Sequence, residues 1–482
     1  MQFKGRTVLV FVLLGMLASA VLTVMIVDSR AGLFASTHAS SPNAENSNLT
    51  SKDLGKLSSA YKLIEEQFYT KVDHDKLVDG AINGMLGSLE DPYSVYMDAQ
   101  EAKKFEEAIS SSFQGIGAEV TLEEGKVIVV APIKGSPAEK AGVHANDVIL
   151  SVNGEKLDGM TLNQAVMKIR GAKGTQAKLE VVRAGVNTPI PFTIVRDDID
   201  VETVEAAMLD QGIGKIEIHQ FSSNTAKRFL DELAKLEKKG LKGLIIDVRN
   251  NPGGLVTSVT EILNPFVPKD KALLQVESRD GSVETTHSKG PGKSYPVTVL
   301  INKGSASASE ILAGALQENV GAKLVGETTF GKGTVQMTFG KELGDGSNMK
   351  MTVFKWLTPN GNWIHKKGIA PDFAVEQPSY FKAAPLSKKE ALKADTTGDD
   401  VKNLQLMLSG LGYTLDRTDG YFSSKTEAIV KQFQQENGLP VTGKVDSPTA
   451  SKIEKKLIET ARKPENDLQL KAAKDELAKL LK

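Results

Sequence analysis

The chain has 482 residues, of which 40% are hydrophobic and 25% charged, with a formal net charge of −1. This length predicts several domains, and the composition excludes a wholly disordered, collagenous or polytopic membrane protein. The balanced charge gives no bulk field that would attract nucleic acid. The absence of cysteine excludes thiol nucleophiles, cysteine-based zinc sites and disulfides, and the six histidines form no HExxH pattern.

The N-terminal segment contains an uncharged apolar run, residues 7–27, preceded by Lys4 and Arg6. At about 1.5 Å per residue, a helix of this length spans a bilayer core of about 30 Å. The positive charge before the run predicts that the N-terminus stays in the cytoplasm and that the rest is exported. A small-residue pattern at 18–20 leaves a cleaved signal peptide as the alternative, but the apolar run continues beyond it, which favours a retained anchor.

The remaining segments differ in their hydrophobic periodicity. Apolar residues at helical spacing alternate with short β-type runs, and strand–helix alternation in the region 198–378 predicts a largely parallel, buried sheet. The predicted segments are a membrane anchor or signal segment at 1–28, a flexible linker at 29–56, a helical region at 57–112, a β-rich domain at 113–197, an α/β domain at 198–378, a linker at 379–398, a small helical domain at 399–458 and a charged helical tail at 459–482. The tail is interpreted as a solvated or partner helix.

The segment 302–310 (NKGSASASE) follows an apolar strand and opens a helix. Ser307 and Glu310 have the spacing of a capping box, with Ser307 as the N-cap residue. Ser309 then lies in the first turn, where free backbone N–H groups and the helix dipole favour an alkoxide and an oxyanion. Ser309 is therefore the candidate nucleophile, and a serine-rich cap without chemistry is the alternative.

Lys332 is the candidate base for this serine, and it stands between two glycines in the segment 330–336 (FGKGTVQ). A lysine begins near a pKa of about 10.4 and must fall toward about 7, a shift that burial can supply. Gln336 can orient the amine without adding an opposite charge. Glycine follows the lysine where a phosphate-binding loop has serine or threonine, which argues against nucleotide binding.

A third segment, 244–254 (LIIDVRNNPGG), runs from a buried strand into a loop with paired glycines. The backbone N–H groups of Gly253 and Gly254 are candidate oxyanion donors, together with that of Glu310. An ordinary Asn-Pro-Gly-Gly turn is the alternative interpretation.

Taken together, DVRNNPGG, GSASASE and FGKGTVQ closely resemble the signature of the carboxyl-terminal processing (tail-specific) serine proteases. LEDPYSVY at 89–96 resembles the N-terminal motif of that family. The resemblance covers residues 57–378 and implies a crotonase-like α/β protease core. It also implies a Ser–Lys dyad in which Ser309 is the nucleophile, Lys332 is the general base and Gln336 assists.

The segment 113–117 (FQGIG), with 136–142 (SPAEKAG), resembles part of a PDZ domain. The resemblance implies that a peptide adds as an extra strand while loop amides hold its terminal carboxylate and Ile116 lines the side-chain pocket. The residues expected to bind the peptide end are Phe113, Gly115, Ile116 and Gly117. Arg170 is interpreted as a solvated surface arginine, with an acidic partner or a substrate as the alternative.

Residues 399–457 resemble small helical peptidoglycan-binding domains. The fold class expected for the whole chain is multidomain α/β and α+β, with an inserted β-rich PDZ domain, a small helical C-terminal domain and one N-terminal transmembrane helix. The apolar positions expected in the core of the small domain are Leu404, Leu408, Ile429 and Phe433.

The function expected from these features is that of an exported, membrane-tethered bacterial serine endopeptidase. It would cleave proteins or peptides selected through their free, apolar C-termini, with access controlled by the PDZ domain and without a cofactor. The other expected partners are cell-wall peptidoglycan, the membrane through the N-terminal helix, and a second copy in a homodimer, but no nucleic acid. The alternative function is a catalytically silent PDZ and wall-binding scaffold, which needs none of Ser309, Lys332 and Gln336.

Overall fold

The computed structural model describes residues 49–481, apart from 124, 134, 184–185 and 187. The chain divides into two compact units, 1–82 and 83–482, and each is described by itself. Within the described residues, no helix is long and apolar enough to cross a membrane. The predicted span at 7–27 lies outside them.

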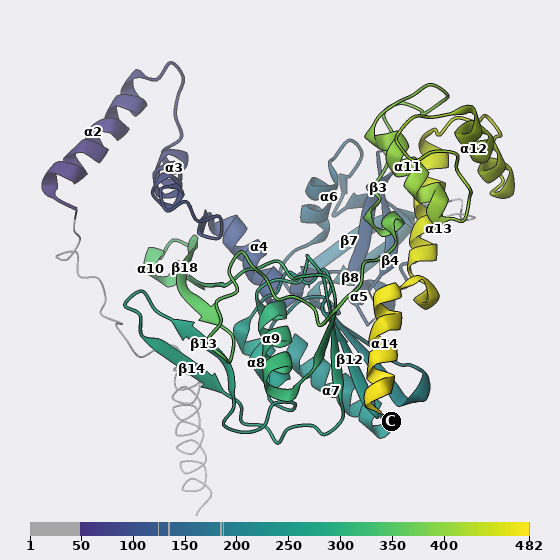
Figure 1. Cartoon of the computed structure of the whole chain (residues 1–482). Helices are drawn as coiled ribbons and strands as arrows, with labels where there is room; N and C mark the ends of the chain where they lie inside the picture. The colour runs from purple at the N-terminus through teal and green to yellow at the C-terminus, as the bar shows by residue number, and fades with distance from the viewer. Residues whose placement is uncertain (1–48, 124, 134, 184–185, 187, 482) are drawn as a thin grey trace, which may run out of the picture. The chain divides into compact units, whose positions relative to one another are not determined.

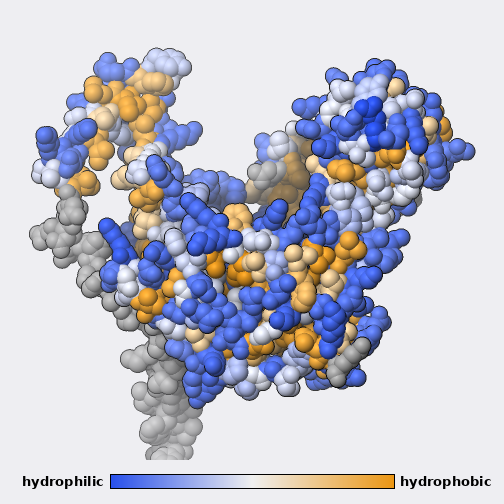
Figure 2. All heavy atoms as spheres, in the orientation of Figure 1, coloured by the Kyte–Doolittle hydropathy of each residue, from blue (hydrophilic) through white to orange (hydrophobic). Residues whose placement is uncertain are grey.

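The first unit contains α2 (Ser51–Gln67) and the start of α3 (His74–Gly87), which agrees with a helical region from residue 57, but α2 begins inside the segment 29–56 that was predicted to be a flexible linker. Thr50 caps α2 and exchanges hydrogen bonds with Asp53, as in a capping box. No residue of α2 is buried, and Leu57 and Ile64 are among its exposed apolar side chains. Figure 2 shows hydrophobic surface on the N-terminal helices.

A six-stranded sheet forms the centre of the second unit (Figure 1). Five of its strands are parallel and β10 is antiparallel to its neighbour, which confirms the expected parallel sheet. In spatial order the strands are β10 (Val204–Met208), β11 (Ile213–Ile218), β12 (Gly243–Asp247), β15 (Val297–Ile301), β16 (Lys323–Gly326) and β19 (Phe373–Ala374).

The side chains of this sheet pack into two hydrophobic layers, one on each face, because successive residues of a strand point to opposite faces. Leu244 and Ile246 pack into the larger layer, and Ile245 packs into the smaller one on the other face. The helices of the larger layer are α7 (Thr225–Lys238), α8 (Val256–Leu263) and α9 (Ala308–Val320).

The smaller layer is covered by the C-terminal helix α14 (Leu468–Leu480), which Figure 1 shows beside β12. Leu470, Ala473 and Leu477 of this helix are buried against the sheet. The interpretation of the tail as a solvated helix is therefore wrong for this face. The apolar residues of α14 recur at helical spacing, and they pack against the sheet of this chain rather than against a separate partner.

A second sheet of five strands lies in the same unit, with β17 and β13 both paired to β18. Its strands are β1 (Val95–Met97), β18 (Asn348–Leu357), β13 (Ala272–Glu277), β14 (Val283–His287) and β17 (Thr334–Thr338). Four other elements of this unit are α4 (Ala99–Ser110) after β1, η1 (Asp210–Gly212) between β10 and β11, α10 (Gly340–Leu343) between β17 and β18, and η2 (Ser379–Lys382) after β19.

The β-rich region folds as an antiparallel sheet with its own hydrophobic core, to which Val129 and Leu179 belong. Its entry strand β2 (Ser112–Gly115) pairs with its exit strand β9 (Asp197–Asp200), so the chain enters and leaves this domain at one place. The other elements are β3 (Ala118–Glu123), β4 (Lys126–Pro132), α5 (Pro137–Ala141), β5 (Val148–Val152), β6 (Glu155–Lys156), α6 (Leu162–Ile169), β7 (Gln176–Val182) and β8 (Ile190–Val195).

A small helical domain precedes α14, as predicted, but the segment 379–398 is not a linker, because Leu386 and Leu392 are buried in the core of this domain. Its helices are α11 (Asp399–Gly410), α12 (Ser424–Glu436) and α13 (Ser447–Ala461), followed by η3 (Pro464–Asn466). The four positions expected in its core, Leu404, Leu408, Ile429 and Phe433, are buried in one cluster.

Candidate active site

Three loops meet where β12, β15 and β16 end. Because these strands are parallel neighbours, their carboxyl ends lie at one edge of the sheet, where the ligand sites of such sheets form. The backbone joins the loops directly: the N–H of Ala306 donates to the carbonyl of Asn251 at 3.0 Å, and that of Phe330 donates to the carbonyl of Ser305 at 3.0 Å. The structure therefore brings together the three segments that the sequence motifs singled out.

Asn251 fixes the loop that follows β12. Its side chain is fully buried, donates to the carbonyl of Ile218 at 2.7 Å and accepts the N–H of Gly253 at 2.9 Å. Its carbonyl also accepts the hydroxyl of Ser309 at 2.9 Å. One buried asparagine thus links the glycine loop to the first turn of α9.

Ser309 lies in that first turn, but its side chain faces the interior. It is fully buried, and its hydroxyl donates to Asn251 rather than to a base. A nucleophile must reach a substrate carbonyl and lie within hydrogen-bond distance of its base. This geometry does not support Ser309 as the nucleophile.

Ser307, two residues earlier, occupies the exposed side of the same turn. It is partly exposed and precedes α9, with φ 54° and ψ −113°. A positive φ is uncommon for a residue other than glycine, and such strained residues cluster at active sites. An added Cβ at Gly253 would lie 2.9 Å from the Cβ of Ser307, so the glycine permits a close approach of the two loops.

The backbone N–H groups around Ser307 differ in their availability. The N–H of Gly253 donates to the side chain of Asn251, and that of Glu310 donates to the carbonyl of Ser307 at 2.8 Å. Using either predicted donor for an oxyanion would require breaking these bonds. Among the described residues, none accepts a hydrogen bond from the N–H of Ala308 or of Gly254, the third predicted donor. Ala308 is the first residue of α9, where the helix dipole favours negative charge.

Glu310 is a fully buried carboxylate that joins two of the loops. One oxygen accepts the N–H of Ser307 at 2.8 Å and the N–H of Lys332 at 2.9 Å. The other accepts the N–H of Gly331 and the hydroxyl of Thr329, both at 2.6 Å. The expected contact between the Glu310 side chain and the Ser307 backbone is present, and the carboxylate also holds the lysine loop.

Lys332 is partly buried, and its Nζ lies 4.8 Å from the ring centre of Tyr93. Burial lowers the pKa of Lys332 and the nearby Lys350 lowers it further, whereas Asp91 and Glu310 act in the opposite direction. The net shift is downward, as a general base requires. Within the described part of the chain, its amine makes no hydrogen bond to Ser307 or Ser309.

The glycines beside Lys332 serve the packing of this loop. An added Cβ at Gly331 would lie 2.9 Å from the N atom of Gly368, and one at Gly333 would lie 2.8 Å from that of His365. The flanking glycines thus let the segment 365–368 pack against the loop, which agrees with the expected close approach of backbone at this point.

Gln336 lies on β17 and its amide donates to two threonines, Thr334 at 3.1 Å and Thr352 at 2.9 Å. The structure therefore places Gln336 in the neighbouring strand pair but does not join it to Lys332.

Sequence reasoning missed two residues beside the lysine, Asp91 and Tyr93, although their motif was noticed. Asp91 accepts the hydroxyl of Ser94 at 2.6 Å, and Ser94 in turn accepts the N–H of Thr352 at 3.0 Å. These bonds hold the motif against β18, where Tyr93 faces the amine. The Asp-Pro turn was a visible signal, but it does not indicate which strand the turn contacts.

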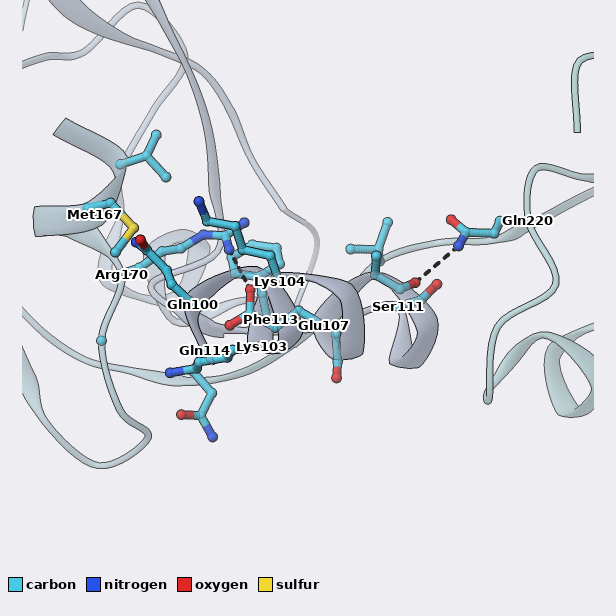
Figure 3. Close-up of a pocket in the computed structure, with 15 residues that line it drawn as sticks. Gln100, Lys103, Lys104, Glu107, Ser111, Phe113, Gln114, Met167, Arg170 and Gln220 are labelled. Atoms are coloured by element: carbon cyan, nitrogen blue, oxygen red, sulfur yellow. Dashed lines mark hydrogen bonds and ion pairs between the residues drawn. The ribbon is translucent and has the colours of Figure 1, made fainter. Parts of the chain in front are cut away.

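A separate cavity of about 570 Å³ lies between α4, β2 and α6 (Figure 3). Figure 3 shows Arg170 pointing toward Glu107, and the guanidinium is 2.7 Å from the carboxylate and 4.4 Å from the ring centre of Phe113. Arg170 thus has an acidic partner, and its interpretation as a solvated residue is wrong.

The predicted peptide-binding residues separate in the structure. Phe113 lines the cavity, whereas Gly115, Ile116 and Gly117 do not. Ile116 is 1% exposed and belongs to the hydrophobic core of the domain, so its side chain does not line a pocket here.

Comparisons with known proteins agree with this architecture. Family models match peptidase family S41 at residues 212–375, a PDZ domain at 128–183, a peptidoglycan binding domain at 397–453 and the N-terminal domain of the activating protease CtpB at 16–101. The carboxy-terminal processing protease CtpB of Bacillus subtilis is 50% identical over 430 residues, which cover 88% of each chain. The chain belongs to the carboxy-terminal processing proteases. It is thus an S41 serine peptidase with a PDZ domain and a helical C-terminal region.

Other relatives extend the same likeness. The carboxy-terminal processing protease CtpA of Bacillus subtilis is 46% identical over 461 residues, covering 95% of this chain and 97% of that one. The solved structure of the photosystem II D1 C-terminal processing protease is 27% identical, covers 68% of this chain and 94% of that chain, and has a TM-score of 0.41.

Proposed function

We propose that this carboxy-terminal processing protease cleaves peptide bonds with a dyad of Ser307 and Lys332. The observation that carries the proposal is the contrast within one turn: Ser307 is partly exposed on a strained backbone, whereas Ser309 is fully buried and already hydrogen-bonded. The role first expected for Ser309 thus passes to Ser307, and Lys332 keeps the role of general base.

In the proposed reaction, Lys332 accepts the proton of the Ser307 hydroxyl while the serine oxygen attacks the substrate carbonyl. The N–H groups of Ala308 and Gly254 stabilise the negative oxygen of the tetrahedral intermediate. Lys332 then returns the proton to the leaving amine. Water hydrolyses the resulting ester and restores the serine. The amine and the hydroxyl must approach to about 3 Å for the first proton transfer.

Gln336 acts, in this proposal, through the threonines that it contacts rather than through the amine. Its bonds to Thr334 and Thr352 hold β17 beside β18, and β17 follows directly from the lysine loop. The residue thereby supports the position of Lys332.

We also propose that the PDZ domain controls access by binding free, apolar C-termini near Phe113 and Arg170. The cavity that these residues line is large enough for part of a peptide, and the guanidinium offers a positive charge to a terminal carboxylate. Strand β2, which pairs with β9, borders this cavity through Ser112, Phe113 and Gln114, and a strand beside the cavity favours binding of the peptide in extended form.

The remaining proposals concern location and assembly. The apolar run at 7–27 supports an N-terminal anchor with the catalytic part outside the cytoplasm. The module at 397–453 supports attachment to cell-wall peptidoglycan. Exposed apolar side chains on α2 favour a homodimer, which sedimentation of the full chain and of a Leu57→Ser variant would test.

Covalent labelling tests the dyad directly. The full chain is treated with a serine-directed phosphonate, and the modified peptide is identified by mass spectrometry. We expect the label on Ser307, with labelling lost in Lys332→Ala and retained in Ser309→Ala. Label on Ser309 in the folded wild-type protein would refute the assignment.

A further inference from the structure

The buried carboxylate of Glu310 has more partners than a helix cap requires. In a capping box the N3 side chain makes one bond, to the N-cap backbone, which here is the N–H of Ser307 at 2.8 Å. Glu310 also accepts the N–H groups of Gly331 and Lys332 and the hydroxyl of Thr329. Of the four bonds to this fully buried carboxylate, three therefore cross between the start of α9 and the lysine loop.

This carboxylate is buried without an ion-pair partner. Within the described residues, no arginine, lysine or histidine side chain lies within salt-bridge distance of it, and hydrogen bonds alone satisfy its charge. Burying an unpaired charge is costly, and the cost is acceptable where hydrogen bonds to the ionised group compensate it. A neutral side chain would cap the helix more cheaply, so the retained charge calls for a further role.

The charged groups around the lysine amine indicate that role. Lys350 on β18 and burial lower the pKa of Lys332, and the negative charges of Asp91 and Glu310 oppose them, while the Tyr93 ring faces the amine. A general base works best when its pKa lies near the working pH, so too large a fall would weaken it. The negative charge of Glu310 thus helps to keep the pKa of Lys332 from falling too far.

We infer that Glu310 is a positioning residue that fixes Ser307 and the Lys332 loop to each other through one carboxylate and keeps a negative charge beside the catalytic amine. This inference rests on the proposed Ser307–Lys332 dyad. The geometric part follows from the shared oxygen, since a single atom accepts both the Ser307 and the Lys332 N–H. The electrostatic part follows from the burial of this carboxylate close to the amine, since among the described residues no lysine, arginine or histidine forms a salt bridge with it.

Two variants separate the geometric from the electrostatic part. Glu310→Gln keeps the shape, removes the charge and turns an NH2 group toward at least some of the N–H donors. We expect kcat for a peptide with a free apolar C-terminus to fall about 100-fold, with KM unchanged. We also expect the acidic limb of the kcat/KM profile to move to lower pH, because the charge that raises the pKa of Lys332 is gone. Glu310→Asp keeps the charge but shortens the reach, so kcat should fall while the acidic limb stays.

Thr329→Val is the matched control. It removes one hydroxyl bond to Glu310 and the acceptor for the N–H of Ile369, at 2.7 Å, but leaves the carboxylate in place. We expect a lower melting temperature and an unmoved acidic limb. If Thr329→Val shifts the limb as Glu310→Gln does, loop disorder explains the shift and the inference is overturned.

Parallel assays separate this inference from the proposed function. Full activity in Ser307→Ala or Lys332→Ala overturns the dyad and the inference with it. If both are inactive while folded Glu310→Gln keeps the wild-type kcat and acidic limb, only the role of Glu310 is overturned. If Glu310→Gln does not fold, Glu310→Asp decides, and an unchanged kcat in that variant overturns the inference.

Discussion

The protease site and the PDZ cavity hold their polar residues in opposite ways. Asn251 and Glu310 are fully buried and each bonds to several backbone groups, whereas Arg170 and Glu107 form a single ion pair with 37% and 23% of their side chains exposed. A buried, satisfied network keeps donors and acceptors in place before the substrate arrives. A partly exposed ion pair contributes only about 0–1 kcal/mol, so the substrate carboxylate proposed to bind here would replace Glu107 at small cost. The difference separates a site built for fixed geometry from one built for exchange.

The strongest test of the fixed site compares its two serines. Ser307→Ala should lower kcat by at least about 10⁴-fold, because the nucleophile is lost. Ser309→Ala should remain active and lose about 1–2 kcal/mol of stability, since it removes one buried hydrogen bond to Asn251. Peptide hydrolysis and thermal unfolding of both variants supply the measurement. An inactive but folded Ser309→Ala beside an active Ser307→Ala would reverse the assignment.

The base gives the next largest effect. Lys332→Ala should lower kcat about 10²- to 10⁴-fold, and Lys332→Arg should also fail, because guanidinium stays protonated. Burial lowers the pKa of Lys332, so the wild-type kcat/KM should rise with pH through a value below that of an ordinary lysine. A pH–rate profile from acid to alkaline pH measures this limb. A profile that is flat over this range would contradict a lysine base.

A medium effect is expected where the tail helix meets the glycine loop. Arg249, in that loop, bonds to Asp467 at 2.8 and 2.9 Å, just before α14 begins. Burial raises the pKa of Asp467, but hydrogen bonds and the charge of Arg249 outweigh it, and the net shift is downward. This interaction therefore stabilises the fold above the unfolded value of about 3.9 and is lost as pH falls through the lower folded pKa.

Asp467→Asn tests that linkage. We expect a loss of about 1–3 kcal/mol at neutral pH and a smaller loss in acid, where the wild type has also lost the charge. Unfolding by urea at several pH values measures the difference. Asp419 is the control: its carboxylate pairs with Arg417 on the exposed surface of the small domain, and Asp419→Asn should change stability by less than about 1 kcal/mol. Equal losses of unfolding free energy in both variants at neutral pH would show that burial of the Arg249–Asp467 pair does not add to its stabilising effect.

The smallest effect is expected at the PDZ cavity. A peptide with a free apolar C-terminus should be cut faster than its amidated form, because amidation removes the charge that Arg170 is proposed to bind. Glu107→Gln removes the competing carboxylate and should lower KM for the free peptide up to about fivefold, within the range of an exposed ion pair. Equal cleavage of free and amidated peptides by the intact enzyme would leave the PDZ domain without a role in choosing ends.

Much of the fold was predictable because the spacing of apolar residues along the sequence indicates where helices and strands form. The apolar run of β12 and the alternating pattern around it indicated a buried parallel sheet, and the start of α9 after Ser307 followed from capping. The proposed assignment departs from the sequence prediction one step later, at Ser309. Position in the first turn was predictable, but the direction of the side chain depends on Asn251, which lies 58 residues away.

Contacts between distant segments explain the other misses. Arg170 and Glu107 are 63 positions apart, so no local pattern links them. The positive φ of Ser307 has no signature in its residue type. The burial of α14, in contrast, has a local signal in the sequence. Leu470, Ala473 and Leu477 form an apolar stripe at helical spacing, but the many charged residues around them favoured the interpretation as a solvated helix.

The chain leaves the sheet after β19 and returns to it with α14, so the small helical domain is an insertion whose two ends lie next to each other. Gln377, after β19, donates to the carboxylate of Asp467 at 2.6 Å and accepts the N–H of Leu468 at 3.1 Å, so the exit and re-entry points touch. Ending the chain after β19 would remove α14 from the sheet and expose Ile245 and its neighbours to water. Replacing residues 379–463 by a short bridge would instead keep that helix in place. If the small domain binds the cell wall as proposed, a pulling force on it would act on both chain segments that join it to the sheet. Both segments meet at Gln377, close to the loop that contains Arg249.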